Sequence, residues 1–125
     1  MLVASTAAFQ PGPHMAVYYA TKAFVLSLGE AIAWELRGTG VTVTTLCPGP
    51  TTTNFFEVAD MRRTALFARV KAMSSAEVAR IGYQGLKAGK RVVIPGLANK
   101  LAALSTRFSP KGVVLSIASY LNSEH

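Results

Sequence analysis

Short apolar or β-branched runs alternate with longer helical patterns along this sequence, and this alternation limits the possible folds more than any other feature. The apolar runs span residues 1–4, 41–47 and 91–96, and the helical patterns span about 16–37, 74–89 and 111–121. Strands that alternate with helices over tens of residues are typical of a parallel sheet with helices on its faces. We therefore predict an α/β fold of about three strands with flanking helices.

Turn and cap residues mark the ends of these elements. Gly38 and Gly40 follow the first helical pattern, where glycine can adopt the left-handed conformation that ends many helices. Ser74 and Glu77 form a capping-box pair at the start of the second pattern. The apolar positions of residues 16–37 occupy more than one stripe, so we expect this helix to be covered on two sides.

Length and cysteine content limit the class of protein. The chain has 125 residues, 50% of them hydrophobic, which suffices for one domain or part of one but not for two. Cys47 is the only cysteine, which excludes an intramolecular disulfide and any multi-cysteine metal site, and favours a reducing, cytoplasmic location. His14 and His125 lack partners at ligand spacing, so we predict no metal site. Prolines interrupt the uncharged stretches, so no transmembrane segment is expected.

The basic residues outnumber the acidic ones, 13 to 6, and their distribution is uneven. Residues 1–60 contain two basic and four acidic residues, whereas 61–125 contain eleven basic and two acidic residues. This asymmetry indicates either a basic face or an acidic counterpart in sequence beyond this chain. The basic residues are scattered and accompany no nucleic-acid-binding motif, so we predict no nucleic-acid partner.

A tyrosine and a lysine four residues apart, Tyr18 and Lys22, begin the first helical pattern and therefore share one face. A phenol has an unperturbed pKa near ~10, and an adjacent ammonium favours the phenolate, so such a pair can exchange protons. Tyr83 and Lys87 have the same spacing, so spacing alone is a weak indicator. Ser5 distinguishes the first pair, because it ends the first predicted strand, where loops over an open parallel sheet form ligand crevices.

Three segments, taken together, resemble consecutive motifs of the short-chain dehydrogenase/reductase family. They are Val3-Ala4-Ser5-Thr6-Ala7-Ala8-Phe9, Tyr18-Tyr19-Ala20-Thr21-Lys22-Ala23 and Cys47-Pro48-Gly49-Pro50-Thr51-Thr52-Thr53. Their order and spacing match the family, and the resemblance covers essentially the whole chain, most specifically residues 1–54. It implies the C-terminal half of a Rossmann-like, doubly wound parallel sheet, with residues 1–125 forming a single partial domain.

The resemblance implies an NAD(P)-dependent oxidoreductase that reduces a carbonyl or oxidises an alcohol. Tyr18 would be the general acid/base that exchanges a proton with the substrate oxygen while hydride moves to or from nicotinamide. Lys22 would favour the ionised form of Tyr18 and hydrogen-bond the nicotinamide ribose. Ser5 would hold and polarise the substrate oxygen, as an oxyanion donor does.

The resemblance also implies binding residues. Tyr18 and Lys22 would contact the cofactor, NADP(H) or NAD(H), together with the residues that match the family's motif for the nicotinamide carboxamide and phosphate: Pro48, Gly49, Thr51 and Thr53. Phe55 and Phe56 would belong to a variable substrate lid over about 51–73. The aromatic, apolar lid indicates a small hydrophobic carbonyl or alcohol substrate.

The family's first half carries a Gly-rich turn that binds the cofactor's phosphates, and this sequence contains no such turn. We therefore expect a fragment that is not active alone, and a homo-oligomer formed through the helix at 16–37 in the full-length protein. Two alternatives stay open. The chain could belong to an epimerase or dehydratase of the same family, or it could be a non-catalytic dimerising or scaffolding remnant.

Overall fold

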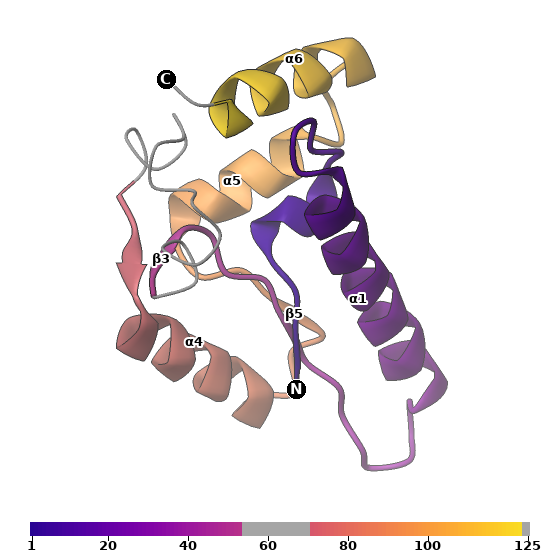
Figure 1. Cartoon of the computed structure of the whole chain (residues 1–125). Coiled ribbons are helices and arrows are strands. Elements are labelled where there is room, and N and C mark those ends of the chain that lie inside the picture. The colour runs from indigo at the N-terminus through magenta and orange to yellow at the C-terminus, as the bar shows by residue number, and fades with distance from the viewer. Residues whose placement is uncertain (54–70, 124–125) are drawn as a thin grey trace.

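The computed structural model of the chain describes residues 1–53 and 71–123, which form the predicted α/β arrangement (Figure 1). Its strands are β1 (Leu2–Val3), β2 (Thr45–Leu46), β3 (Thr51–Thr52), β4 (Met73–Ser74) and β5 (Val92–Val93). Its helices are the 3-10 helix η1 (Thr6–Phe9) and the α-helices α1 (Ala16–Glu35), α4 (Ser75–Lys87), α5 (Leu97–Ser105) and α6 (Lys111–Asn122).

A parallel sheet in the order β1-β2-β5 forms the centre of the structure. Thr45 of β2 pairs with Leu2 of β1 and with Val92 of β5. Backbone hydrogen bonds continue past the short strands, as where the Ala4 N–H donates to the Leu46 carbonyl at 2.8 Å. Because all three strands are parallel, the segments that follow them meet at one edge of the sheet.

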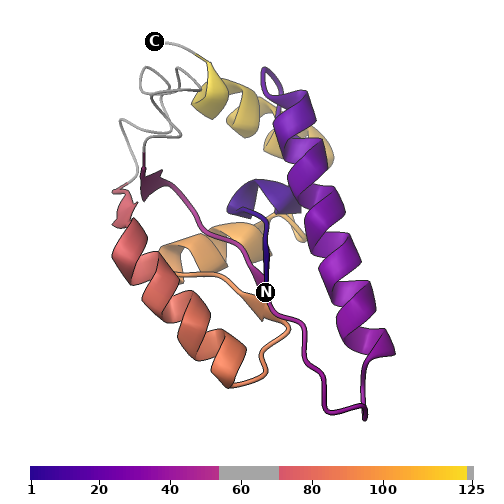
Figure 2. The ribbon, with the colours of Figure 1, turned by 60° about the horizontal axis from the view of Figure 1, so that its bottom comes forward.

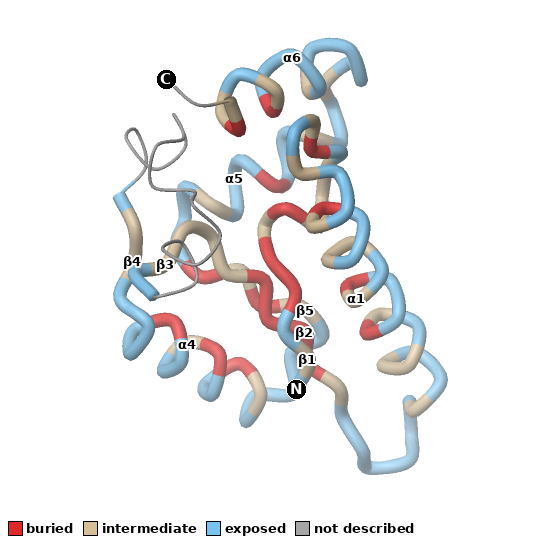
Figure 3. The backbone as a smooth tube through the Cα atoms, viewed as in Figure 1, coloured by how far each residue is buried: buried red, intermediate tan, exposed pale blue. Residues whose placement is uncertain are grey.

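Helices α1 and α4 cover opposite faces of this sheet (Figures 1 and 2). On one face Leu26 of α1 packs with Cys47, and on the other Val78 of α4 packs with Leu46 and Val93. Leu46 and Cys47 serve different faces because successive side chains of a strand point in opposite directions. The core therefore consists of two thin layers on either side of the strands (Figure 3).

Two glycines let these helices approach the sheet closely. A Cβ atom at Gly29 of α1 would overlap the Thr45 hydroxyl, and one at Gly85 of α4 would lie 2.3 Å from a methyl carbon of Val93. Any side chain at either position would push its helix away from the strands.

The long helix is confirmed, but its predicted second cover is not present within the described residues. Its sheet-facing side is buried, whereas four large apolar side chains on other sides are 77%, 67%, 41% and 60% exposed: Val17, Phe24, Leu28 and Trp34. The predicted glycine stop is confirmed, because Gly38 and Gly40 follow the helix with φ of +77° and +82°.

The start of α4 is also as predicted, since the Ser74 side chain accepts a hydrogen bond from the Glu77 N–H at 3.2 Å. Helix α5 and the β3–β4 pair, in contrast, are absent from the sequence prediction. The N-cap of α5 is Gly96, which has no side chain to mark a helix start, and Pro95-Gly96 is typical of a turn. Strands β3 and β4 are two residues each, too short to show a periodicity.

Helices α5 and α6 lie together at the end of the molecule toward which the parallel strands run (Figure 1). The Thr106 hydroxyl, just after α5, lies 3.2 Å from the Phe9 carbonyl and ties this end to η1. Among residues 1–53 and 71–123, no helix has both the length and the apolar character needed to cross a bilayer.

Candidate active site

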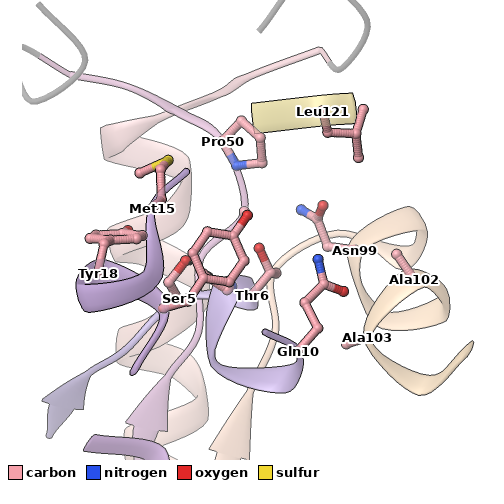
Figure 4. A pocket seen from close by; sticks show the side chains of 13 residues that line it. Ser5, Thr6, Gln10, Met15, Tyr18, Pro50, Asn99, Ala102, Ala103 and Leu121 are labelled. Atoms are coloured by element: carbon pink, nitrogen blue, oxygen red, sulfur yellow. Dashed lines mark hydrogen bonds between the residues drawn. The ribbon is translucent and has the colours of Figure 1, made fainter. Parts of the chain in front are cut away.

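A cavity of about 210 Å³ opens at the carboxyl ends of the strands, between η1, the start of α1, the loop after β2 and the two C-terminal helices. Figure 4 shows Ser5, Tyr18 and Met15 on one side of it and Asn99, Ala102 and Ala103 on the other. Ligand crevices form at this edge of open α/β sheets. The cavity is therefore the candidate active site of the described residues.

Ser5 lies two residues after the end of β1 and is the N-cap of η1. Its side-chain oxygen accepts a hydrogen bond from the Ala7 N–H at 3.1 Å, and the residue is only 9% exposed. Because that bond uses a lone pair of the oxygen, the hydroxyl proton stays available to donate into the cavity. The sequence prediction placed Ser5 at a strand end, and the structure confirms that position.

Tyr18 and Lys22 lie in the first two turns of α1, with the Lys22 ammonium nitrogen 5.7 Å from the centre of the Tyr18 ring. Tyr18 lines the cavity, whereas Lys22 is half-buried and is not among the residues that line it. The comparison pair has nearly the same geometry, at 5.6 Å, but Tyr83 is 58% exposed on α4. Placement beside Ser5 in a shared cavity, rather than the Tyr–Lys contact, therefore distinguishes Tyr18.

The loop after β2 brings a third segment to the same place. The Pro48 carbonyl accepts a hydrogen bond from the Thr6 N–H at 2.9 Å, which joins the loop to η1. Gly49 and Pro50 line the cavity, and the Thr51 hydroxyl donates to the Gly49 carbonyl at 2.9 Å. Thr51 and Thr53 are not among the residues that line the cavity.

The predicted lid falls largely outside the described residues. Phe55 and Phe56 both lie in the range 54–70, which the structure does not describe. The described ends of the predicted lid, Thr51–Thr52 and Met73–Ser74, pair with each other as β3 and β4.

Asn99 is a cavity residue that sequence reasoning missed. It comes from α5, and its amide nitrogen donates to the Pro95 carbonyl at 2.9 Å. The same amide lies over Gly49, because a Cβ atom there would be 2.5 Å from the Asn99 nitrogen. No local pattern marks Asn99, because its role depends on a helix that the sequence prediction did not contain. Gln10 brings a second unpredicted polar group to the cavity.

A set of hydrogen bonds that we call the C-terminal clasp joins α6 to the start of α1 and the loop before it. The buried Tyr19 hydroxyl donates to the Asn122 side-chain oxygen at 3.1 Å, and the Asn122 amide donates to the Pro13 carbonyl at 3.1 Å. Burial raises the pKa of the Tyr19 hydroxyl above its ordinary value, so the phenol keeps the proton that it donates to Asn122. The clasp therefore holds α6, including the cavity residue Leu121, beside the loop that leads into α1.

Cys47 lies one residue before the Pro48 loop and is fully buried. Burial, with a smaller contribution from Glu30, raises the pKa of its thiol from 9.0 to about 11. A thiol that stays protonated at neutral pH is a poor nucleophile, so Cys47 is a packing residue, as its position in the sequence suggested.

Comparisons with known proteins identify the family to which this chain is similar. A family model described as short chain dehydrogenase matches residues 1–63, a range that contains Ser5, Tyr18, Lys22 and the Pro48 loop. The chain is 34% identical over 116 residues to 3-dehydrosphinganine reductase TSC10B of Arabidopsis thaliana, covering 89% of this chain and 35% of the relative.

Two solved structures share the fold. A short-chain dehydrogenase from Sphingobium yanoikuyae in complex with NADPH has a TM-score of 0.67 and 28% identity, over 89% of this chain and 42% of that one. A 7β-hydroxysteroid dehydrogenase has a TM-score of 0.74 and 25% identity, over 93% of this chain and 45% of that one. The chain thus spans less than half the length of each of these three proteins.

Proposed function

The chain belongs to the short-chain dehydrogenase family, and we propose that it supplies the proton-transfer half of an oxidoreductase that interconverts a carbonyl compound and its alcohol. One observation carries the proposal. Ser5 and Tyr18 come from separate segments and line one cavity at the carboxyl edge of the sheet, together with Gly49. A hydroxyl and a phenol that converge in this way can bind and protonate a single substrate oxygen.

In the direction of carbonyl reduction, Tyr18 donates its phenolic proton to the substrate oxygen as that oxygen gains negative charge. The Ser5 hydroxyl donates a hydrogen bond to the same oxygen and orients it. The Lys22 ammonium, 5.7 Å from the Tyr18 ring, stabilises the phenolate that remains. In alcohol oxidation the proton moves in the opposite direction.

The residues at this edge fit the nicotinamide half of NAD(H) or NADP(H). Gly49 keeps the loop after β2 free of a side chain beside the cavity, and Lys22 provides a cation for the ribose. When bound, the cofactor supplies or accepts the hydride. The sequence contains no Gly-x-Gly-x-x-Gly turn, so we propose that residues outside this chain bind its phosphates.

The cavity wall indicates an apolar substrate. Met15, Ala102, Ala103 and Leu121 form the apolar part of the wall, and polar side chains lie on both sides of the cavity, with Ser5 on one side and Asn99 on the other. The names of two similar proteins refer to a sphinganine derivative and to a hydroxysteroid, which are both lipids. We therefore propose a lipid-like ketone or secondary alcohol as substrate.

The test uses a fusion in which the N-terminal half of a related dehydrogenase precedes residue 1. Tyr18→Phe should lower kcat by about 10²–10⁴-fold, the usual contribution of a general acid, while the Kd for NADPH changes little. Tyr83→Phe is the matched control, because Tyr83 and Lys87 reproduce the Tyr–Lys contact away from the cavity. Equal turnover of the two variants would refute the assignment of Tyr18.

A second candidate, a non-catalytic dimerising module, is favoured by the exposed apolar side of α1. Phe24 is 67% exposed and Leu28 41%, which is a large exposure for apolar residues on a helix. We propose that this side mediates homo-oligomer formation, so sedimentation velocity should show that Phe24→Glu shifts the fusion toward monomer. A fusion that dimerises but turns over no ketone or alcohol would favour the module over the enzyme.

A further inference from the structure

Helix α5 presents an apolar stripe to solvent. Leu97, Leu101 and Leu104 are 73%, 58% and 50% exposed, and Phe108, in the turn after the helix, is 82% exposed. Their spacing of four, three and four residues places them along one side of a helix. The opposite side of α5 carries the cavity residues Asn99 and Ala103. The stripe therefore faces away from the molecule.

Helix α6 carries a second outward stripe. Val113, Ile117 and Tyr120 are 49%, 56% and 45% exposed, and they follow the same helical spacing. A short connection at residues 106–110 joins α5 to α6 at one end of the molecule (Figure 1), and many residues of both helices are exposed (Figure 3). We refer to these seven residues as the α5–α6 surface.

Basic residues flank the α5 part of this surface. Between Glu77 and Glu124 the sequence contains seven Lys or Arg residues and no Asp or Glu. Lys100 and Arg107 flank the leucine stripe on α5, and both line a shallow depression with Leu104. That depression also contains Arg91 and one acidic residue, Glu30, so its charge is positive overall.

We propose that the α5–α6 surface docks peripherally on an anionic lipid bilayer. An exposed apolar stripe with basic side chains on its flank is the composition of helices that lie in the membrane interface. The leucines and Phe108 would enter the acyl boundary, while Lys100 and Arg107 would remain at the level of the anionic headgroups. The core of a protein–protein interface, in contrast, is depleted in lysine.

Docking in this orientation would place the cavity directly beneath the membrane-facing helix. Asn99, Ala102 and Ala103 of α5 line the cavity on the side opposite the leucine stripe. An apolar compound that leaves the bilayer would then reach the cavity along α5 without crossing bulk water. Binding to lipid depends only on the α5–α6 surface, so it can be tested independently of the proposed chemistry.

The experiment is co-sedimentation of the 125-residue chain with two kinds of vesicle. One kind contains phosphatidylcholine alone, and the other contains phosphatidylcholine with about 30 mol% of the anionic lipid phosphatidylserine. We expect binding to the anionic vesicles, and binding that weakens as salt is raised from about 0.05 to about 0.5 M. Absence of binding, or equal binding to neutral vesicles, would overturn the proposal without any variant being needed.

Two pairs of variants locate the contact. Lys100→Gln with Arg107→Gln should lower the partition coefficient about 30-fold, at about 1 kcal/mol for each basic residue near an anionic surface. Its control is Arg80→Gln with Lys87→Gln, which removes the same charge from exposed positions on α4 and should change binding much less.

Leu101→Ser with Phe108→Ser should lower binding at least about tenfold, whereas Trp34→Ser, at an exposed position on α1, should not. All the substituted side chains are exposed, so far-UV circular dichroism should be unchanged. If the α4 or α1 controls reduced binding as much as the α5 variants, the assigned surface would be wrong. If the α5 variants instead abolished self-association in sedimentation velocity and vesicle binding was absent, a second copy would be the occupant and the proposal would fail.

Discussion

Removing one hydroxyl from the C-terminal clasp should destabilise the chain by a measurable amount. Tyr19 is 7% exposed and Asn122 5% exposed, so Tyr19→Phe leaves the Asn122 oxygen buried without its donor. The lost hydrogen bond contributes about 1 kcal/mol, and the stranded acceptor brings the expected loss to about 1–3 kcal/mol. Tyr83→Phe, at an exposed position, should change the free energy of unfolding by less than about 0.5 kcal/mol.

Urea unfolding followed by far-UV circular dichroism would measure these differences. Asn122→Ala, alone and combined with Tyr19→Phe, completes a double-mutant cycle for the two side chains that are 3.1 Å apart. We expect a coupling energy of about 1 kcal/mol, because the contact is direct and buried. A coupling energy near zero, or equal losses for the Tyr19 and Tyr83 variants, would refute the reasoning that the clasp stabilises the fold.

Three further predictions concern the sheet and its helices. Burial raises the pKa of the Cys47 thiol from 9.0 to about 11, so the folded chain holds the thiol proton more tightly than the unfolded chain does. The protonated thiol therefore contributes fully to the free energy of unfolding below pH 9, and this contribution is lost as pH rises to 11. The loss should approach about 3 kcal/mol, and Cys47→Ala, compared in urea at pH 8 and 11, should lack this component. Gly85→Ala should lower the melting temperature, because its Cβ would lie 2.3 Å from Val93, whereas Gly112→Ala, with no atom within 4 Å, should not. Ser74→Ala removes the α4 cap and should cost about 1 kcal/mol in urea unfolding; no change would mean that the cap contributes nothing.

Much of the fold could be predicted because it depends on local patterns. The strand runs, the helix at Ala16–Glu35 and the capped helix at Ser75–Lys87 follow from periodicity, β-branching and turn residues within a few positions. Helix α5 escaped prediction because Gly96 offers no capping side chain and Pro95-Gly96 is typical of a turn. The expectation that α1 is covered on two sides is not met within the described residues, because apolar content alone does not say what covers a helix.

Some residues of the candidate site could likewise be predicted from the sequence, and others could not. Ser5, Tyr18 and Gly49 could be selected from the sequence, since each belongs to a short motif beside a strand or helix end, and the structure places all three on one cavity. The catalytic and binding roles of all the predicted site residues stay predictions, and four of these residues do not line that cavity: Lys22, Pro48, Thr51 and Thr53. Asn99 could not be selected, because its importance depends on packing against Gly49, fifty positions earlier in the chain.

The sequence by itself determined the order of the three sheet strands and of helices α1, α4 and α6, and the spacing of Ser5, Tyr18 and Lys22, because these depend on residues close together in the chain. Only the tertiary structure decided which segments meet. Tyr19 and Asn122 form a buried hydrogen bond across 103 positions, and no local pattern encodes such a pairing. The same packing turns the inner side of α5 toward the cavity and its leucines toward solvent.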